Sequence, residues 1–359
     1  MLGGAQRQLV ELLKGADRSR YAIEVISLST EKIAYADAIR ELGIPLTLIA
    51  QRGTWSWSAF FALHRALRRA RPAIVHTWLF TADFYGRLAA KLAGVRRIIS
   101  TVRSVETDKP THYVAVDRLL RRWTDGFIVN AKAVGDMLVQ REQVPPAKLR
   151  LIYNGIDLKR LDPATTSAAI HRLIGARETA PLVGIVGRLA PVKDHETFLR
   201  AARLVTVEMP ETHFLIVGTG RLNMRLRELT RFLALESWVH FLPNQADVAS
   251  IYAALDLLVV SSRYEGCSNV ILEAMALSRP VVATAVGGNP ELVSPETGRL
   301  VPPQHPEALA RTIVELLRNP VERRALGAAA RRRIEERFSL ARMVRETEAV
   351  YEELMEDAT

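Results

Sequence analysis

Residues 257–282 read LLVVSSRYEGCSNVILEAMALSRPVV, and this stretch decides the fold class. Its apolar run begins at Leu257 and ends at Ser261, which is typical of a buried strand. A loop with Glu265 and Gly266 follows. A helix is expected to begin near Ser268, a suitable N-cap residue, and to end before Pro280. Strand, loop and helix in this order form the repeating unit of an α/β domain.

The same alternation continues in both directions along the chain. Short apolar runs are separated by stretches with apolar spacing of three and four, which predicts parallel sheets with crossover helices. The expected strands of the first half are Ala22–Leu28, Pro45–Ala50, Ala73–His76, Arg97–Val102, Gly126–Val129 and Leu149–Tyr153. Those of the second half are Leu182–Val186, His213–Val217, Val239–Leu242, Leu257–Ser261, Val281–Ala283 and Arg299–Val301.

Two such series predict two doubly wound, Rossmann-like α/β domains that face a cleft. The first is expected over residues 1–155 and the second over residues 156–340, with the break at Asn154-Gly155-Ile156-Asp157. Residues 341–359 are expected to form a C-terminal helix that packs back toward the first domain. Ligands of open parallel sheets bind beyond the carboxyl ends of the strands, so a site is expected in the cleft.

Glu265 and Glu273 are the carboxylates of greatest interest. Glu273 lies in an apolar helix, where an ionised carboxylate is costly unless something hydrogen-bonds to it. The vicinal hydroxyls of a sugar or ribose are suitable donors, although pairing with a nearby Arg would satisfy Glu273 equally well. Glu265 follows a strand and lies near a helix N-terminus, which favours an anion such as a phosphate.

Two cations follow another strand, in the segment LVGIVGRLAPVKDH. The strand ends at Gly187, and Arg188 and Lys193 precede the next helix. Cations at the carboxyl end of a strand suit a diphosphate, although Arg and Lys in loops are often merely exposed. Gly218-Thr219-Gly220 follows a further strand, where it would admit a nucleotide close to the backbone or simply form a turn.

Several of these segments resemble the motifs of the retaining glycosyltransferases of family 4, which have the GT-B architecture. They are GRLAPVKDHETFLRA, YEGCSNVILEAMALSRPVVAT and VGGNPELV, together with GGAQRQLVELLK near the start and NGID at the domain junction. The resemblance implies transfer of a sugar from a nucleotide-sugar donor, expected to be a UDP-sugar, to a glycan or lipid-linked acceptor. It implies retention of configuration without a metal ion or other cofactor, because fixed cations can stabilise a departing nucleoside diphosphate.

The resemblance also implies a role for each motif residue. Glu273 would hold the ribose hydroxyls and Glu265 would contact the donor sugar, while Arg188 and Lys193 would bind the diphosphate and stabilise the leaving group. Glu265, Arg188 and Lys193 are thus the catalytic candidates. The remaining donor-binding candidates are Gly3, Gly4, Gly187, Gly218, Gly266, Cys267, Ser268 and Asn269.

The acceptor side departs from the family pattern. Many relatives carry His in the loop after the fourth strand, where this chain has Arg103. Arg cannot act as a general base, but it can bind a phosphate on the acceptor or donor. His76 follows an earlier strand and is a second acceptor-side candidate. A nucleotide-sugar 2-epimerase of the same architecture is the alternative function, and the pair Glu265 and Glu273 favours transfer to an acceptor.

Charge is distributed unevenly along the chain. Residues 1–150 carry 24 Lys and Arg against 13 Asp and Glu, whereas residues 151–359 carry 25 against 26. The basic half predicts an acidic partner, or else a solvated basic surface.

The aromatic residues Trp55, Trp57, Phe60 and Phe61 lead into Leu63, Leu67 and a cluster of Arg65, Arg68, Arg69 and Arg71. Aromatics beside an Arg-rich helix suggest an anionic membrane surface, or else an ordinary crossover helix that packs its apolar face on the sheet. Nucleic acid is not expected, since no nucleic-acid motif is present. The single cysteine, the scattered histidines and the lack of a long apolar run predict a cytoplasmic or peripheral protein without a metal.

The start of the chain departs from a doubly wound domain. Gly3-Gly4 should follow a strand, yet the first apolar strand comes only at Ala22–Leu28. The first strand of such a sheet lies in its middle, so without it the flanking strands would face a gap with unpaired backbone groups. We therefore expect the native protein to begin at least about 8 residues before Met1, enough for a strand of ordinary length.

Overall fold

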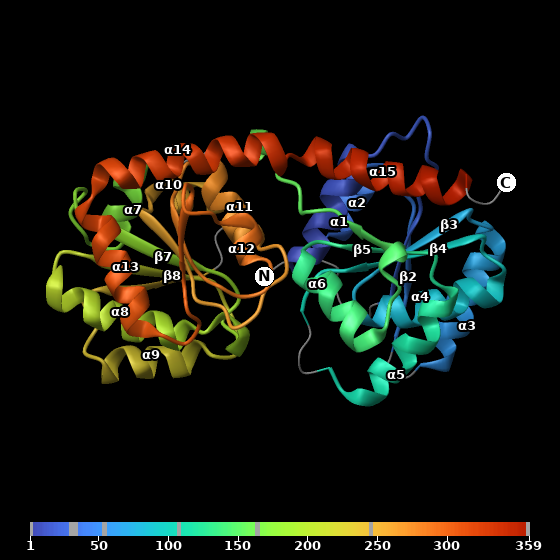
Figure 1. Cartoon of the computed structure of the whole chain (residues 1–359), viewed down its shortest axis with the longest axis horizontal. Helices are drawn as coiled ribbons and strands as arrows, with labels where there is room; N and C mark the ends of the chain where they lie inside the picture. The colour runs from blue at the N-terminus through green and yellow to red at the C-terminus, as the bar shows by residue number, and fades with distance from the viewer. Residues whose placement is uncertain are drawn as a thin grey trace. The chain divides into compact units, whose positions relative to one another are not determined.

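The computed structural model describes residues 3–28, 35–51, 56–105, 109–161, 166–243 and 247–356. The chain divides into two compact units. One is formed by Ile156–Ser339, and the other by the residues up to Gly155 together with those from Leu340 onward. Both are α/β units with parallel strands, and Figure 1 labels their elements.

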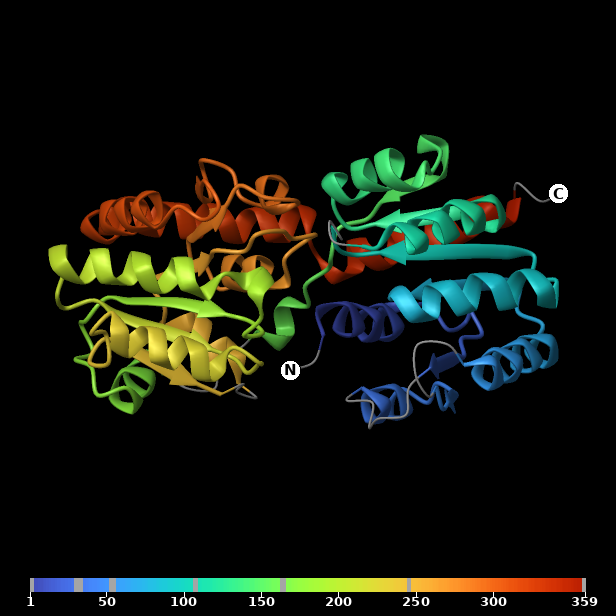
Figure 2. The same cartoon turned by 90° about the horizontal axis from the view of Figure 1, so that it is seen from below.

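The unit formed by Ile156–Ser339 contains a six-stranded parallel sheet in the order β12-β11-β10-β7-β8-β9. Its strands are β7 (Leu182–Val186), β8 (His213–Val217), β9 (Val239–Leu242), β10 (Leu257–Val260), β11 (Val281–Thr284) and β12 (Gly298–Val301). The central strands β7, β10 and β11 are buried along their whole length, because helices cover both faces of the sheet (Figure 2). The expected doubly wound domain is confirmed.

The helices of this unit are α7 (Ser167–Leu173), α8 (His195–Glu208), α9 (Asn223–Phe232), α10 (Val248–Ala254), α11 (Asn269–Ala276), α12 (Asn289–Leu292), α13 (Pro306–Arg318) and α14 (Pro320–Arg337). Helices α8 and α13 pack side by side over one face, where Phe198 and Ile313 join Phe214 of the sheet in a single apolar cluster. The core lies directly beneath the loops at the carboxyl ends of β7 and β10.

The other unit contains two separate parallel ladders among its described residues. One pairs β1 (Val25–Leu28) with β2 (Leu46–Ile49). The other has the order β3-β4-β5-β6, formed by β3 (Ile74–Trp78), β4 (Arg97–Val102), β5 (Gly126–Val129) and β6 (Leu149–Leu151). No described strand pairs with β1 on the side away from β2. Among the described residues, the gap expected in the middle of this sheet therefore lies between β1 and β3.

Helices cover both faces of these two ladders. They are α1 (Gly4–Gly15), α2 (Ala36–Glu41), α3 (Trp57–Ala70), α4 (Phe80–Ala93), α5 (Thr111–Leu120), α6 (Lys132–Met137) and the C-terminal α15 (Leu340–Glu356). Figure 1 shows α15 running along this unit beside α1. Its apolar residues Met343, Val350 and Leu354 pack with Ile99 and Ile128 of the sheet.

A cluster of buried ion pairs surrounds Arg87 of α4. Arg87 is 1% exposed and lies 2.7 Å from Asp83, and it also pairs with Asp117. Lys109 completes the cluster by pairing with Asp117 and, at 2.7 Å, with Glu142. Each buried charge therefore has an opposite partner, as low-dielectric surroundings require.

Candidate functional site

The sheet of Ile156–Ser339 has one point at which the order of its strands reverses. From β7 the chain adds β8 and β9 on one side, and from β10 it adds β11 and β12 on the other. Loops after β7 and β10 diverge to opposite faces at such a switch point and leave a crevice that binds ligands. The loops concerned are 187–194 and 261–268, which contain all three catalytic candidates and half of the candidate residues.

Short hydrogen bonds tie these two loops together. The Ser261 hydroxyl donates to the backbone oxygens of Lys193 (2.9 Å) and Asp194 (3.0 Å). The Arg263 backbone N–H donates to the Val192 oxygen at 2.8 Å, and its guanidinium lies 3.3 Å from Asp194. Lys193 is therefore held at the end of β10 although it belongs to the loop after β7.

Lys193 and Glu265 form an ion pair at this junction. The same Glu265 oxygen accepts a hydrogen bond of 2.6 Å from the Ser262 hydroxyl. The side chains of Lys193 and Glu265 are 22% and 12% exposed, so the pair is accessible from solvent yet largely desolvated. Arg188 is exposed on the same loop and makes no ion pair with a described residue. The loops thus offer two paired cations, Lys193 and Arg263, together with the exposed Arg188.

Glu273 lies in α11 and is 4% exposed. Its Oε2 accepts a hydrogen bond of 2.8 Å from the hydroxyl of Tyr252, which is itself fully buried in α10. Tyr252 is therefore a hydrogen-bond partner of this carboxylate. Sequence reasoning missed Tyr252 because nothing in a run of apolar residues marks one aromatic as the partner of a carboxylate 21 residues away.

Ser268 precedes α11 at the N-cap position, as expected, but its hydroxyl caps no backbone N–H. The side chain is 3% exposed, and its Oγ has no hydrogen-bond partner among the described residues. A buried hydroxyl without a partner is costly, so this atom is available to a ligand. Gly266 and Cys267 are also buried, and Asn269 is the first residue of α11.

Glycines support the two loops by permitting close backbone contacts. A Cβ on Gly287, whose φ is +51°, would lie 1.9 Å from the Glu265 backbone oxygen, to which Gly288 N–H donates at 3.3 Å. A Cβ on Gly220 would lie 2.4 Å from the Leu189 oxygen. Both turns therefore pack directly against the loops that carry Glu265 and Arg188. Gly187 and Gly218 are buried at the ends of β7 and β8.

The acceptor-side candidates lie in the other unit. Arg103 directly follows β4, whereas His76 is the middle residue of β3 and does not follow that strand as expected. The Arg103 guanidinium lies 4.9 Å from the centre of the Trp78 ring and donates to Asn154. Both ring nitrogens of His76 are engaged, one by the Tyr351 hydroxyl at 2.7 Å and the other by the Thr101 hydroxyl at 2.5 Å. Burial, and to a smaller extent Arg103, lower the pKa of His76 to about 3. His76 is therefore a neutral link between β3, β4 and α15, and the interpretation of it as an acceptor ligand loses support.

Gly3 and Gly4 begin α1 in this unit. Gly3 is the N-cap, and its oxygen accepts a hydrogen bond of 3.2 Å from the Tyr35 hydroxyl. The Gln8 side chain, one turn later, exchanges hydrogen bonds with the backbone of Gly155 at 3.0 and 3.1 Å. Helix α1 thus begins near the carboxyl edge of the strands, where glycine loops of doubly wound domains are found.

Two family profiles match the chain and together cover both units. The profile described as Glycosyltransferase Family 4 matches residues 2–160, and the profile described as Glycosyl transferases group 1 matches residues 180–319. No helix in the described ranges is long and apolar enough to cross a membrane.

Relatives of known activity resemble parts of the chain. A GDP-mannose-dependent monoacylated alpha-(1-6)-phosphatidylinositol monomannoside mannosyltransferase of Corynebacterium glutamicum is 34% identical over 52% of this chain and 51% of its own. A UDP-Gal:alpha-D-GlcNAc-diphosphoundecaprenol alpha-1,3-galactosyltransferase of Escherichia coli is 26% identical over 82% of this chain and 80% of its own. The chain thus spans about half the length of the first relative.

The fold is shared with solved structures at lower sequence identity. The Anabaena protein HepE, in complex with UDP and glucose, superposes with a TM-score of 0.87 at 21% identity, covering 98% of this chain and 97% of that one. A sucrose-phosphate synthase from Thermosynechococcus elongatus gives a TM-score of 0.83 at 24% identity, covering 98% and 93%. The architecture is therefore GT-B, two Rossmann-like domains in one chain.

Proposed function

Because the chain belongs to glycosyltransferase family 4, we propose that it transfers a sugar from a nucleotide-sugar donor to a glycan or lipid-linked acceptor with retention of configuration. The supporting observation is the junction of the loops after β7 and β10, where Lys193 pairs with Glu265 at the switch point of the sheet. A pre-paired cation and carboxylate there can address the two halves of a nucleotide sugar, its diphosphate and its sugar.

Each residue has a role in this proposal. Arg188 and Lys193 bind the diphosphate, and their charge stabilises the nucleoside diphosphate as the bond from the sugar to its phosphate oxygen breaks. Glu265 accepts hydrogen bonds from the sugar hydroxyls, and the free Ser268 hydroxyl bonds a phosphate or sugar oxygen. Glu273, oriented by Tyr252, holds the ribose. Fixed cations supply the electrostatic stabilisation, so no metal ion is needed.

The acceptor is proposed to carry a phosphate or diphosphate near the hydroxyl that reacts. Arg103 supports this assignment, because Trp78 and Asn154 hold its guanidinium in a defined orientation at the end of β4. A planar guanidinium held in this way suits phosphate oxygens better than it suits neutral hydroxyls. The Escherichia coli and Corynebacterium relatives, whose names specify lipid-linked acceptors, fit the same class.

A panel of UDP- and GDP-sugars, offered with and without undecaprenyl-diphosphate and phosphatidylinositol glycosides, tests the proposal. We expect nucleoside diphosphate release only when an acceptor is present, at a rate that EDTA does not change. An α-linked donor should give an α-linked product. Conversion of the donor into its 2-epimer without any acceptor would instead establish the epimerase. A β-linked product from an α-linked donor would overturn retention.

The basic N-terminal unit is proposed to bind an anionic membrane surface through α3. Trp57 and Phe61 are 74% and 62% exposed on this helix, and the exposed Arg65, Arg68 and Arg69 follow them. Aromatics beside cations at helical spacing form the face of an interfacial helix. Trp55, expected in the same segment, lies outside the described residues. Phe60, Leu63 and Leu67 pack on the core instead, so they do not contribute to that face.

A further inference from the structure

The backbone of Leu79 differs from that of an ordinary leucine. Leu79 joins β3 to α4 with a φ of 72° and a ψ of 151°, a combination that is essentially restricted to glycine. Arg71, Gln143 and Asp194 also have positive φ, but their ψ values of 52°, 37° and 49° belong to the left-handed helical region, which side chains tolerate better. Leu79 therefore carries a conformational cost that these three residues do not share.

Close packing between β3 and α4 explains why the chain turns so sharply here. A Cβ on Gly86 would lie 2.5 Å from Cγ2 of Thr77, so the helix lies directly against the strand that it follows. The first turn of α4 is also fixed, because Asp83 lies 2.7 Å from Arg87 and its N–H donates to the Leu79 oxygen at 2.8 Å. The change of direction from strand to helix therefore takes place at Leu79.

Leu79 and Phe80 leave much of their apolar surface exposed at this turn. Leu79 is 44% exposed and Phe80 is 38% exposed. A glycine at position 79 would adopt the same backbone without strain, so the leucine side chain adds little packing to the fold at a conformational cost. Backbone strain of this kind concentrates at functional sites, where it serves a ligand rather than the fold. The two side chains therefore indicate a surface that a ligand covers.

This surface lies at the edge of the sheet that also carries Arg103. Trp78 pairs in register with Thr101, so Leu79 and Phe80 leave β3 at the level at which the chain leaves β4 toward Arg103. Neighbouring strands lie only about 5 Å apart, and the Arg103 guanidinium lies 4.9 Å from the centre of the Trp78 ring. An apolar surface beside a cation is complementary to an apolar chain that ends in a phosphate.

The Phe80 ring is held in a defined position by its neighbours. It meets the ring of Tyr113 at 90°, with 4.9 Å between the ring centres. The Lys109 ammonium lies 5.5 Å from the centre of the Phe80 ring, and two carboxylates hold that ammonium in turn. Neither Leu79 nor Phe80 has a side-chain atom that could bond the hydroxyls of a sugar. A hydrocarbon chain, which requires only apolar contact, is the ligand that suits this pair.

We propose that Leu79 and Phe80 bind the first carbons of a lipid chain on the acceptor, next to a phosphate that Arg103 binds. This inference rests on the proposed function and narrows its acceptor to a lipid phosphate whose chain contacts the protein. The exposed apolar area of both side chains is then buried by the ligand, which strengthens binding in proportion to the area covered. A glycan acceptor without a lipid lacks this contact.

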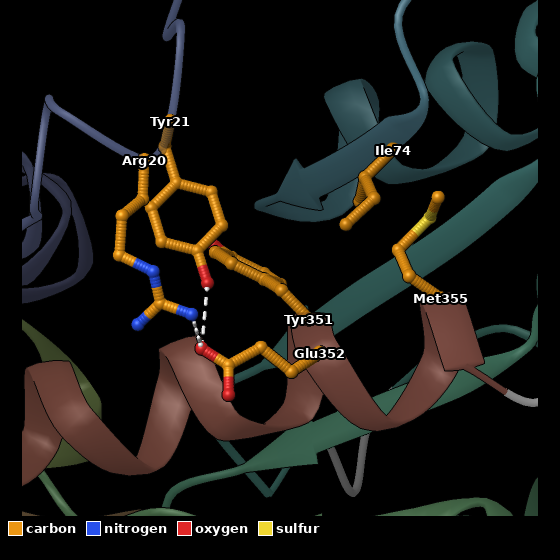
Figure 3. A pocket seen from close by; sticks show the side chains of 6 residues that line it. All are labelled: Arg20, Tyr21, Ile74, Tyr351, Glu352 and Met355. Atoms are coloured by element: carbon orange, nitrogen blue, oxygen red, sulfur yellow. Dashed lines mark hydrogen bonds and ion pairs between the residues drawn. The ribbon is translucent and has the colours of Figure 1, made fainter.

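Another apolar surface, at the opposite end of β3, provides a control. Figure 3 shows a pocket there of about 190 Å³, with the rings of Tyr21 and Tyr351 on one side and the side chains of Ile74 and Met355 on the other. Ile74 begins β3 and Trp78 ends it, so the pocket lies about 13 Å or more along the strand from Leu79. A lipid chain bound in this pocket would not lie beside Arg103.

Calorimetric titration of the full chain with prenyl phosphates tests this proposal without measuring sugar transfer. The probes are farnesyl phosphate and its short analogue dimethylallyl phosphate, which share a phosphate and differ in chain length. We expect farnesyl phosphate to bind at least about tenfold more tightly, since each buried CH₂ group adds to the affinity. Leu79→Ala and Phe80→Ser should each remove most of this preference and leave the binding of dimethylallyl phosphate unchanged. Arg103→Gln should weaken both probes by the same factor.

Matched controls separate the proposed contact from other apolar surfaces. Leu92→Ala removes a leucine that is 57% exposed near the far end of α4, and Met355→Ala alters the pocket at the other end of β3. Both variants should keep the preference for farnesyl phosphate. Leu79→Gly should lose that preference while its urea midpoint stays the same or rises, because glycine relieves the strained backbone. Loss of stability together with loss of binding would assign Leu79 to packing.

Equal binding of the two phosphates to the unchanged protein would overturn the proposal. So would a preference for farnesyl phosphate that Met355→Ala or Trp57→Ser removes and Leu79→Ala does not, because the chain would then lie in the pocket or on α3. The proposed function can fail separately. Transfer to acceptors with short and long chains at equal KM would refute the lipid contact alone, whereas farnesyl phosphate binding without any sugar transfer would refute the proposed function alone.

Discussion

At the scale of single residues, the site depends on carboxylates and cations whose neighbours hold them in place. Glu273 shows this best, because one buried tyrosine orients a buried carboxylate inside an apolar helix. Lys193 and Glu265 are positioned by hydroxyls on the two loops that they join. Losing either kind of contact should change catalysis more than it changes folding.

Replacing Glu273 or Arg188 with Ala should lower turnover by about two orders of magnitude, the usual cost of losing one transition-state electrostatic contact. Initial rates of nucleoside diphosphate release measure this effect. Arg200→Ala provides the matched control, because Arg200 is exposed on α8 and its one ion pair within the described ranges is with Glu196. Folded variants with near-normal turnover would show that the crevice is wrongly assigned.

Tyr252→Phe should weaken nucleotide binding without removing any group that touches the nucleotide. The hydroxyl donates one hydrogen bond to Glu273, and a buried acceptor that loses its donor costs about 1–3 kcal/mol. Calorimetric titration with UDP and GDP should show roughly tenfold weaker binding of whichever nucleotide the protein prefers. An unchanged dissociation constant alongside lower stability would assign Tyr252 to packing alone.

His195 predicts a pH dependence of stability. Burial, and then the charge of Lys193, lower its pKa to about 4, from the value of 6.5 expected when unfolded. Between these values the unfolded chain binds a proton that the folded chain does not, so stability falls as the pH falls from about 6.5 to 4, by about 1.4 kcal/mol per unit.

Urea unfolding of His195→Met and of the unchanged protein measures this contribution. We expect the difference in unfolding free energy between pH 6.5 and 5.5 to shrink by about 1 kcal/mol in the variant. Above pH 8 this histidine is neutral in both the folded and the unfolded chain, so the slopes of the two proteins should agree there. Equal slopes in the acidic window would mean that His195 becomes charged without unfolding.

At the scale of elements, α3 combines a buried face with an exposed face that mixes aromatic and basic residues. Replacing Trp57 and Phe61 with Ser should abolish sedimentation with vesicles that contain anionic lipid, since the aromatics provide the apolar insertion. Replacing Arg65, Arg68 and Arg69 with Gln should remove the preference for anionic over neutral vesicles.

Phe232→Ser is the matched control for α3, because Phe232 is 83% exposed on α9 in the other unit. Its binding to vesicles should equal that of the unchanged protein. Equal sedimentation with neutral and anionic vesicles, or none with either, would contradict the role assigned to α3.

The elements were predictable from sequence wherever burial is complete. The expected bounds of β7 and β8 match the structure residue for residue, because runs such as LVGIV are apolar on both faces and are flanked by turns. The half-buried β1 begins at Val25 rather than Ala22, since its apolar pattern does not mark its start. Contacts between elements, such as the hydrogen bond of Tyr252 to Glu273, could not be predicted, because a local sequence pattern does not show which elements pack together. The hydrogen bonds of both His76 nitrogens to hydroxyls of other elements could not be predicted for the same reason.

At the scale of the whole molecule, the chain passes between its two units twice. It leaves the N-terminal unit at Gly155 and returns at Leu340 as α15. Helix α15 then supplies Met343, Val344, Val350 and Leu354 to an apolar cluster that also contains Leu12, Ile99, Ile128 and Ile152. The N-terminal unit therefore depends on the last segment of the chain for part of its core.

Ending the chain at Ser339 should unfold the N-terminal unit and leave the other one intact. Losing four buried apolar side chains costs several kcal/mol, comparable to the whole stability of a domain. Limited proteolysis followed by mass spectrometry should find cuts across residues 3–155 and a resistant fragment near Ile156–Ser339. A truncated chain whose two units resist protease equally would contradict this dependence.

The two crossings are also neighbours, since Ile156 N–H donates to the Phe338 oxygen at 2.9 Å and Ile156 bridges to Ser339. The unit that carries all donor candidates except Gly3 and Gly4 thus begins and ends at one spot, like a cassette inserted into a host. Gene recombination could exchange it through two joints only a few ångströms apart, leaving the host domain's contacts unbroken. Lineages of such enzymes could then acquire new sugar donors by trading cassettes while they keep the acceptors that they already recognise.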